Sequence, residues 1–253
     1  MKLQFASDLH LELQDNSRFL KHQPLPVEGD ILILAGDIVY LGNDSLLKHP
    51  FGDWASENFS EVLVVPGNHE FYGGYNLQQL HDGWSLEIKP NVHYFYNAVI
   101  LLNGIEIIMT TLWSNIPVQD AFAVEHGVND FRRIKSGEEV IDFVRFNEEH
   151  QRCCSFVDKA ISKPKQRKRI VVTHHLPSFL LMDPQFKGSS LNGAFVSELY
   201  DLIVDSDIDY WIFGHSHRNI STSIGSCKCL SNQMGYVAYC EHMDFEPGRF
   251  LDV

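Results

Sequence analysis

Histidine, aspartate, asparagine and glutamate residues gather in five short clusters, and these residue types bind metal ions. In chain order the clusters are Asp8-Leu9-His10, Gly36-Asp37, Gly67-Asn68-His69-Glu70, His174-His175 and Gly214-His215-Ser216-His217. A carboxylate combined with a neutral imidazole suits Mn, Fe or Zn ions better than Ca or Mg ions. Each cluster alone is a weak signal, but five of them in one chain predict a metal centre.

Each cluster follows a short apolar run that is typical of a buried strand. The runs cover residues 2–6, 31–35, 62–65, 170–173 and 210–213, and Pro66-Gly67 marks the end of the third. Loops at the ends of buried strands hold polar side chains rigidly in α/β proteins. In an extended segment residues two apart point the same way, so Asp8 and His10 are expected to bind one ion.

The remaining pattern predicts an α/β fold with a second sheet. Strands are expected over residues 93–96, 99–102 and 105–110, with a hairpin turn at Asn103-Gly104. Consecutive strands after alternating strands and helices indicate a second, mostly antiparallel sheet packed on the first. Helices are expected over residues 45–59, 77–88, 140–161 and 195–204, the third after a capping box at residues 136–139. Because the clusters span residues 8–217, we expect one domain over residues 1–253.

Three further segments are irregular or strongly charged. Residues 113–133 and 177–193 are expected to wall a substrate cleft, because long irregular segments in compact domains are either functional or disordered. The basic run over residues 163–169 is expected to be a solvated surface loop.

The composition argues against several classes of protein. The 253 residues carry a formal net charge of −13, and an acidic surface repels phosphate backbones, so general nucleic-acid binding is not expected. No apolar run is long enough to cross a membrane. The five cysteines are an odd number and no secretory signal precedes them, so we expect reduced thiols in a cytoplasmic protein. Nothing in the sequence indicates the oligomeric state.

Taken together and in this order, the five clusters resemble the motifs of the calcineurin-like metallophosphoesterases over the first 217 residues. The resemblance implies two mixed β-sheets packed as a sandwich flanked by helices, with a dinuclear metal centre at the strand ends. The implied cofactors are two divalent or trivalent transition-metal ions; Mn is favoured, with Fe or Zn as alternatives. One ion is implied to bind Asp8, His10 and His217, the other Asn68, His174 and His215, with Asp37 as the bridge. His215 and His217 are two residues apart, so on an extended segment their side chains share a face and can bind neighbouring ions.

The implied reaction is hydrolysis at phosphorus, in which a hydroxide that bridges the metals attacks and a proton reaches the leaving alkoxide. His69 matches the general acid of the family, and the unperturbed imidazole pKa of about 6.5 suits that role. Glu70 is expected to orient His69, although the family often has Asp at this position.

Substrate contacts are expected from three residues. Arg132 and Arg133 can bind phosphate through their guanidinium forks, the alternative being surface ion pairing. His175 adjoins a metal ligand and is expected to face the substrate or to support that ligand, with a structural role as the alternative.

The resulting prediction is a phosphomonoesterase or phosphodiesterase that acts on a small or medium phosphorylated molecule. One alternative is a metal-holding protein-interaction scaffold of the same fold, which would be expected to lose His69 or a ligand, whereas this chain keeps them all. The other alternative is a nuclease acting on short oligonucleotides, which would need a basic track along the cleft.

Overall fold

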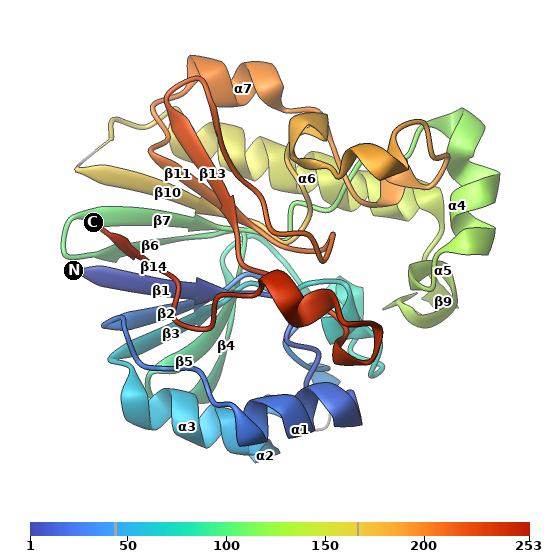
Figure 1. Cartoon of the computed structure of the whole chain (residues 1–253). Helices are drawn as coiled ribbons and strands as arrows, with labels where there is room; N and C mark the ends of the chain where they lie inside the picture. Colours follow the sequence, from blue (N-terminus) through green and yellow to red (C-terminus); the bar gives the residue numbers. More distant parts are fainter. Residues whose placement is uncertain (43–44, 166) are drawn as a thin grey trace.

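Two β-sheets pack face to face in the computed structural model, and helices cover the outer faces of both (Figure 1). The structure describes residues 1–42, 45–165 and 167–253. Within those residues each of the two main sheets has six strands. The predicted α/β fold, with two mixed sheets flanked by helices, is therefore confirmed.

The first sheet is parallel at its centre and antiparallel at its edges. Its strands, in spatial order, are β14 (Phe250–Asp252), β1 (Lys2–Ala6), β2 (Ile31–Leu34), β3 (Glu61–Val64), β5 (Val92–Tyr96) and β4 (Trp84–Lys89). β1, β2, β3 and β5 pair in parallel, while β14 and β4 pair antiparallel at the two edges.

The second sheet is built in the same way. Its strands, in spatial order, are β12 (Ser221–Ile224), β13 (Cys227–Ser231), β11 (Tyr210–Phe213), β10 (Lys168–Val172), β7 (Ile105–Met109) and β6 (Ala98–Leu102). Its four central strands are parallel, so the expectation of a mostly antiparallel second sheet is wrong. The predicted β6–β7 hairpin exists, but β7 then pairs with β10, a partner distant in sequence whose direction the local pattern does not encode.

Side chains alternate between the two faces of each central strand, so these strands contribute to two layers of the core. Leu3 and Phe5 of β1 pack between the sheets, against residues of the second sheet such as Ile107. Leu32 and Leu34 of β2 point the other way, into the cluster that the helices cover. Burial on both faces explains why these runs are almost continuously apolar.

The helices lie on the outer faces and beside the strand ends. They are α1 (Gln14–His22), α2 (Ser45–Lys48), α3 (Pro50–Asn58), α4 (Ala121–Gly127), α5 (Asp130–Arg133), α6 (Phe143–Ile161) and α7 (Tyr200–Asp205). In Figure 1, α1, α2 and α3 lie below the first sheet, and α6 and α7 lie above the second. At the right of that view are α4, α5 and a short hairpin formed by β8 (Lys135–Ser136) and β9 (Glu139–Val140).

Residues 77–88 were predicted to form a helix, which is wrong. They form a 3₁₀ turn at Leu77–Gln79 and then most of β4. Gly83 breaks the helical path with a φ of 80°. From Trp84 onward the large apolar side chains recur at every second residue, which is the strand period.

Two other predicted helices are shorter than expected. The helix predicted over residues 195–204 is confined to α7, because the chain at Val196 is extended and forms a bridge with Leu176. The predicted capping box is instead the turn between β8 and β9. α6 begins later, where the Asp142 side chain accepts from the backbone N–H of Arg145 at 2.8 Å. Residues 113–133, predicted to be irregular, contain α4 and α5.

Arg169 ends the basic run that was predicted to be a solvated loop, yet it is fully buried. Its guanidinium donates to the Glu106 carboxylate at 2.5 Å and also to Asp207. It donates further to the carbonyl oxygens of Ile161 and Lys163. One member of the run is therefore structural, while Gln166 within it lies outside the described residues.

No helix in the described part of the chain is long and apolar enough to cross a bilayer. The five cysteines are free thiols, and Cys153, Cys227 and Cys229 are buried.

Candidate metal centre

The five sequence clusters lie together at one edge of the sandwich, in the loops that follow β1, β2, β3, β10 and β11 (Figure 1). These loops are hydrogen-bonded to one another beyond the strand ends. The backbone N–H of Asp8 donates to Gly36 O and that of Gly214 donates to His174 O, each at 2.9 Å. The Asp8 carboxylate accepts from the backbone N–H of His215 at 3.0 Å. These hydrogen bonds between the loops thus fix the clusters relative to one another.

Five of the predicted ligands have left-handed backbone conformations. Their φ values are 55° for Asp8, 46° for His10, 56° for Asp37, 76° for His215 and 50° for His217. Non-glycine residues adopt this region rarely, at a cost of about 1–3 kcal/mol each, and such strain clusters at functional sites. The extended chain predicted at Asp8–His10 and at His215–His217 is therefore wrong, because turns rather than strand alternation orient these side chains.

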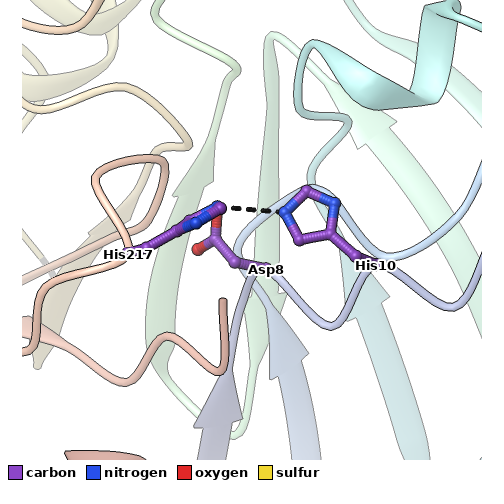
Figure 2. A group of neighbouring side chains, drawn as sticks. All are labelled: Asp8, His10 and His217. Atoms are coloured by element: carbon purple, nitrogen blue, oxygen red, sulfur yellow. Dashed lines mark hydrogen bonds and ion pairs between the residues drawn. The ribbon is translucent and has the colours of Figure 1, made fainter. Parts of the chain in front are cut away.

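The first ligand group joins the two sheets. Figure 2 shows Asp8 and His10, which follow β1, converging with His217, which follows β11. One ligand atom from each of these side chains lies within 4.8 Å of the other two. Nε2 of His10 and Nε2 of His217 are 3.0 Å apart, and Nε2 of His217 is 3.5 Å from Oδ1 of Asp8. Three donor atoms therefore point into one small space.

The second ligand group contains Asp37, His174 and His215, whose ligand atoms also lie within 4.8 Å of one another. Nε2 of His174 is 3.0 Å from Oδ1 of Asn68 and 3.4 Å from Oδ1 of Asp37. The other oxygen of Asp37 lies 3.8 Å from Nε2 of His10 in the first group. Asp37 is thus placed between the two groups.

A polar contact on the outer side of each ring turns the other ring nitrogen toward the centre. Nδ1 of His10 contacts Glu12 at 3.1 Å, Nδ1 of His174 contacts Ala35 O at 2.9 Å, and Nδ1 of His217 contacts Glu241 at 2.7 Å. When the proton is on Nδ1, the Nε2 lone pair of each of these three rings can bind a metal ion. His215 is reversed, because its Nε2 contacts Ala194 O at 3.2 Å and leaves Nδ1 free. Metal-binding histidines are oriented in this way, so the donor set fits metal ions.

Burial and the neighbouring carboxylates set the protonation of these rings. Burial, together with the charge of His174, lowers the pKa of His215 to about 3, so His215 is a neutral donor. Burial also acts to lower the pKa of His174 and His217. Asp37 and Asp8 outweigh it and raise these pKa values to about 9 and about 10, respectively. A metal ion must therefore displace protons from both rings when it binds.

Asn68 is held so that its oxygen faces the centre. Its side-chain amide donates to Asp130 Oδ1 at 2.8 Å, which turns Oδ1 of Asn68 toward His174. The Tyr72 hydroxyl donates to the same Asp130 oxygen. Asp130 was not predicted as a site residue, because a polar residue in an irregular segment gives no separate signal.

His69, the predicted general acid, lies at the rim of the centre with its side chain 16% exposed. Its backbone N–H donates to Asp37 Oδ1 at 2.9 Å, its ring packs on Tyr72 with centroids 4.3 Å apart, and its Nε2 lies 3.4 Å from the Tyr236 hydroxyl. Burial acts to lower the pKa of His69, but Asp37 and Glu12 raise it above its ordinary value. His69 also lies within 4.8 Å of the ligand atoms of His10 and Asp37.

The carboxylate that contacts His69 is Glu12 and not Glu70, which corrects the predicted role of Glu70. Glu12 Oε1 lies 3.0 Å from Nδ1 of His69. Glu70 instead accepts from the backbone N–H groups of Asp37, Ile38 and Gly67 at 2.7–3.0 Å, and so ties two ligand-bearing loops together. Burial and the charge of Asp37 raise the pKa of Glu70 to about 8.

A cleft of about 320 Å³ opens above the ligands. Asp37, Asn68 and His69 contribute to its floor, and both segments that were predicted to wall it supply lining residues, such as Asn129 and Leu191. Its remaining walls include Tyr72, Tyr236, Phe195, Arg218 and Glu241.

The predicted substrate-binding residues lie outside this lining. Arg132 is exposed and its guanidinium donates to His126 O. Arg133 is also exposed and stacks on Tyr72, 4.9 Å from its ring centroid, so it reaches the cleft only through that ring. Arg218, which directly follows the last cluster, does line the cleft. Its position directly after Gly214-His215-Ser216-His217 is the signal in the sequence that places it near the cleft.

His175 is fully buried and cannot face a substrate in this structure. Its ring packs edge-on against His215, with centroids 4.1 Å apart, and lies 5.4 Å from Trp113. Both ring nitrogens lack a hydrogen-bond partner within the described residues. Burial holds the pKa of His175 well below its usual value. The geometry suits support of a ligand, which was the other predicted role, but the ligand in closest ring contact is His215 and not the adjoining His174, whose ring centroid is 5.5 Å away.

The chain is similar to known proteins in sequence and in fold. The family model for calcineurin-like phosphoesterases matches residues 1–219. An uncharacterised protein of Acanthamoeba polyphaga mimivirus is 27% identical over 276 aligned positions, which cover 99% of this chain and 96% of that protein. The solved structure of phosphopantetheinyl hydrolase from Mycobacterium tuberculosis matches with a TM-score of 0.72 at 17% identity, covering 99% of this chain and 95% of that one. At that identity the likeness concerns the fold.

Proposed function

The chain belongs to the calcineurin-like phosphoesterases, and we propose on that premise that it hydrolyses small or medium phosphoesters with two bound transition-metal ions. The family makes it a metallophosphoesterase. The observation that carries the proposal is the pair of ligand groups that meet at Asp37 beneath a cleft. Because both sheets supply ligands, we also propose that residues 1–253 act as one domain.

We assign one ion to Asp8, His10 and His217 and the other to Asn68, His174 and His215, with Asp37 between them. Mn, Fe and Zn all accept such mixtures of imidazole and oxygen donors, and Mn is our first choice. When bound, a pair of such ions activates water and neutralises charge on the phosphoryl oxygens. Asn68 contributes a neutral oxygen, which limits the negative charge that an anionic substrate meets.

In the reaction water adds to phosphorus, the P–O bond to the ester group breaks, and the departing oxygen takes up a proton. We assign the delivery of that proton to His69. Glu12 holds its Nδ1 at 3.0 Å, which turns Nε2 toward the cleft. A positioned imidazole contributes about 10²–10⁴-fold in such steps.

The cleft favours a small substrate over a polynucleotide. Its volume of about 320 Å³ is at the lower end of the range for small-molecule pockets. Among the described residues Arg218 is the one Lys or Arg side chain in its lining, which is no basic track for a nucleic-acid backbone. Phosphomonoesters and phosphodiesters both remain within the proposal.

The test is removal and return of the metal. Protein stripped with a chelator should have negligible activity on p-nitrophenyl phosphate and bis(p-nitrophenyl) phosphate. Mn²⁺ should restore activity as two ions bind per chain, measured by elemental analysis. The same assays with Fe²⁺ and with Zn²⁺ show which metal gives the highest activity, separately from whether the protein is active at all. A protein that binds two ions and hydrolyses neither ester with any of the three metals would refute the proposal and favour the scaffold alternative.

A further inference from the structure

A second cavity of about 180 Å³ lies beside the cleft and shares part of its wall. Phe186, Leu191, Phe195 and Ser216 line both spaces. The shared wall begins at the metal centre, because the Phe195 ring stacks on the candidate ligand His215 with centroids 4.7 Å apart and planes at 26°. The organic group of a substrate whose phosphoryl group lies over the ligands can therefore extend along this shared wall into the cavity.

The cavity is apolar. Leu176 and Met182 complete its lining together with the shared Phe186, Leu191 and Phe195, and Ser189, Asn192 and Ser216 supply its polar groups. No charged side chain among the described residues lines it. A cavity of about 150 Å³ that is lined by apolar side chains has room for benzene. A cavity of 180 Å³ thus has room for an aromatic ring or an alkyl chain of about six carbons.

We propose that this cavity binds an apolar alkyl or aryl group of the substrate, so that the preferred substrates are phosphoesters of hydrophobic alcohols. The inference rests on the proposed function, because it places the phosphoryl group at the metal centre. Burial of each methylene in such a cavity strengthens binding, and the gain stops when the cavity is full.

The experiment uses n-alkylphosphonates from methyl to octyl, which cannot be hydrolysed and carry one organic group each. Their dissociation constants for the Mn²⁺-loaded protein are measured by calorimetry and as inhibition of p-nitrophenyl phosphate hydrolysis. We expect the dissociation constant to fall by about two- to fourfold per methylene and to level off near hexyl. The heat-capacity change of binding should become more negative along the series.

Two substitutions separate the cavity from general hydrophobicity. Ser189→Trp places a large ring in the cavity and should abolish the dependence on chain length while leaving the affinity for methylphosphonate unchanged. Ser190→Trp, at the exposed neighbouring position outside the lining, is the matched control and should behave as the wild type. Met182→Glu is a second variant, which should weaken the binding of hexylphosphonate and leave the affinity for methylphosphonate unchanged. Thermal unfolding checks that each variant is folded.

Equal affinity for all alkylphosphonates in the wild type would overturn the inference. An unchanged chain-length dependence in both Ser189→Trp and Met182→Glu would overturn it as well, and so would a protein that binds none of the series. A protein that binds the series with the expected trend but hydrolyses no ester would refute the proposed function and leave the cavity assignment standing.

Discussion

Oε1 of Glu12 lies 3.0 Å from Nδ1 of His69 and 3.1 Å from Nδ1 of His10, so one carboxylate oxygen supports the proposed acid and a proposed ligand. Burial acts to raise the pKa of Glu12, but its hydrogen bonds to the two rings lower it below its ordinary value. The Glu12 side chain is only 5% exposed. A water molecule therefore has little access to this position and cannot readily take over the contacts of Glu12 to the two rings.

Replacing Glu12 should therefore affect turnover more than substrate affinity. Glu12→Ala should lower kcat by about 10- to 100-fold at saturating Mn²⁺, with little change in KM, because His69 loses its fixed orientation. The loss should be larger for alkyl esters than for p-nitrophenyl esters, which need less help from an acid. Glu241→Ala, which removes the carboxylate that contacts Nδ1 of His217 and the backbone N–H of Tyr236 but neither His69 nor His10, is the matched control and should show no dependence on the leaving group. Equal losses on all esters for Glu12→Ala would contradict the positioning role.

His69→Ala should retain both metal ions and lose turnover. We expect kcat to fall by about 10²–10⁴-fold, most severely for esters with poor leaving groups. Elemental analysis of the purified variant provides the check on metal content. Because His69 also lies near His10 and Asp37, loss of metal from this variant would instead make it a ligand.

Asp37→Ala should reduce the metal content below two ions per chain, because Asp37 lies within reach of both ligand groups. The increase in Tm on adding Mn²⁺ should shrink accordingly, since a ligand stabilises the folded protein according to its affinity. Asp53→Ala removes a surface carboxylate that pairs with Lys89, and it should bind two ions and respond to Mn²⁺ as the wild type does. Two tightly bound ions in Asp37→Ala would contradict the bridging role.

Arg218→Ala should raise KM for phosphoesters by about tenfold, because a charge-assisted hydrogen bond to phosphate is lost from the cleft wall. Arg132→Ala should leave KM unchanged, since this side chain lies outside the lining. Steady-state kinetics on one ester with both variants decides between the two arginines. An effect of Arg132→Ala without one of Arg218→Ala would return substrate binding to the residue that the sequence indicated.

Arg169→Met should lower the free energy of unfolding by about 3–5 kcal/mol, because it leaves the Glu106 carboxylate without its buried partner. Urea denaturation measures this change, and kcat at low temperature should be unaffected because Arg169 is not among the residues that line the cleft. Lys168→Met removes a partly exposed ion pair to Asp209 and should cost at most about 1 kcal/mol.

The strand ends were readable in the sequence because burial on both faces leaves an apolar run that polar residues terminate abruptly. Asp8, Asp37, Asn68, His174, His215 and His217 were found in this way, and the structure brings them together. The left-handed turns at five ligands were not predictable, because φ depends on hydrogen bonds to loops distant in sequence.

Supporting residues were harder to find than ligands. Glu12, Asp130 and Glu241 act through hydrogen bonds to rings, an amide and a hydroxyl that lie far away in the sequence, and acidic residues near turns are common in any surface loop. The parallel pairing of the central strands in the second sheet could not be predicted for a related reason. A buried strand looks the same whether its neighbour runs parallel or antiparallel, and the pairing of β7 with β10 is decided by packing across the whole chain.

Each ligand group draws residues from both sheets, with Asp8 and His10 facing His217 in one and Asp37 facing His174 and His215 in the other. Ions bound there would brace the two layers against sliding, so docking of the sheets and occupancy of the centre are thermodynamically linked. A substitution deep between the layers, far from any donor atom, can thus weaken metal retention, and a chelator can loosen the packing of the sandwich.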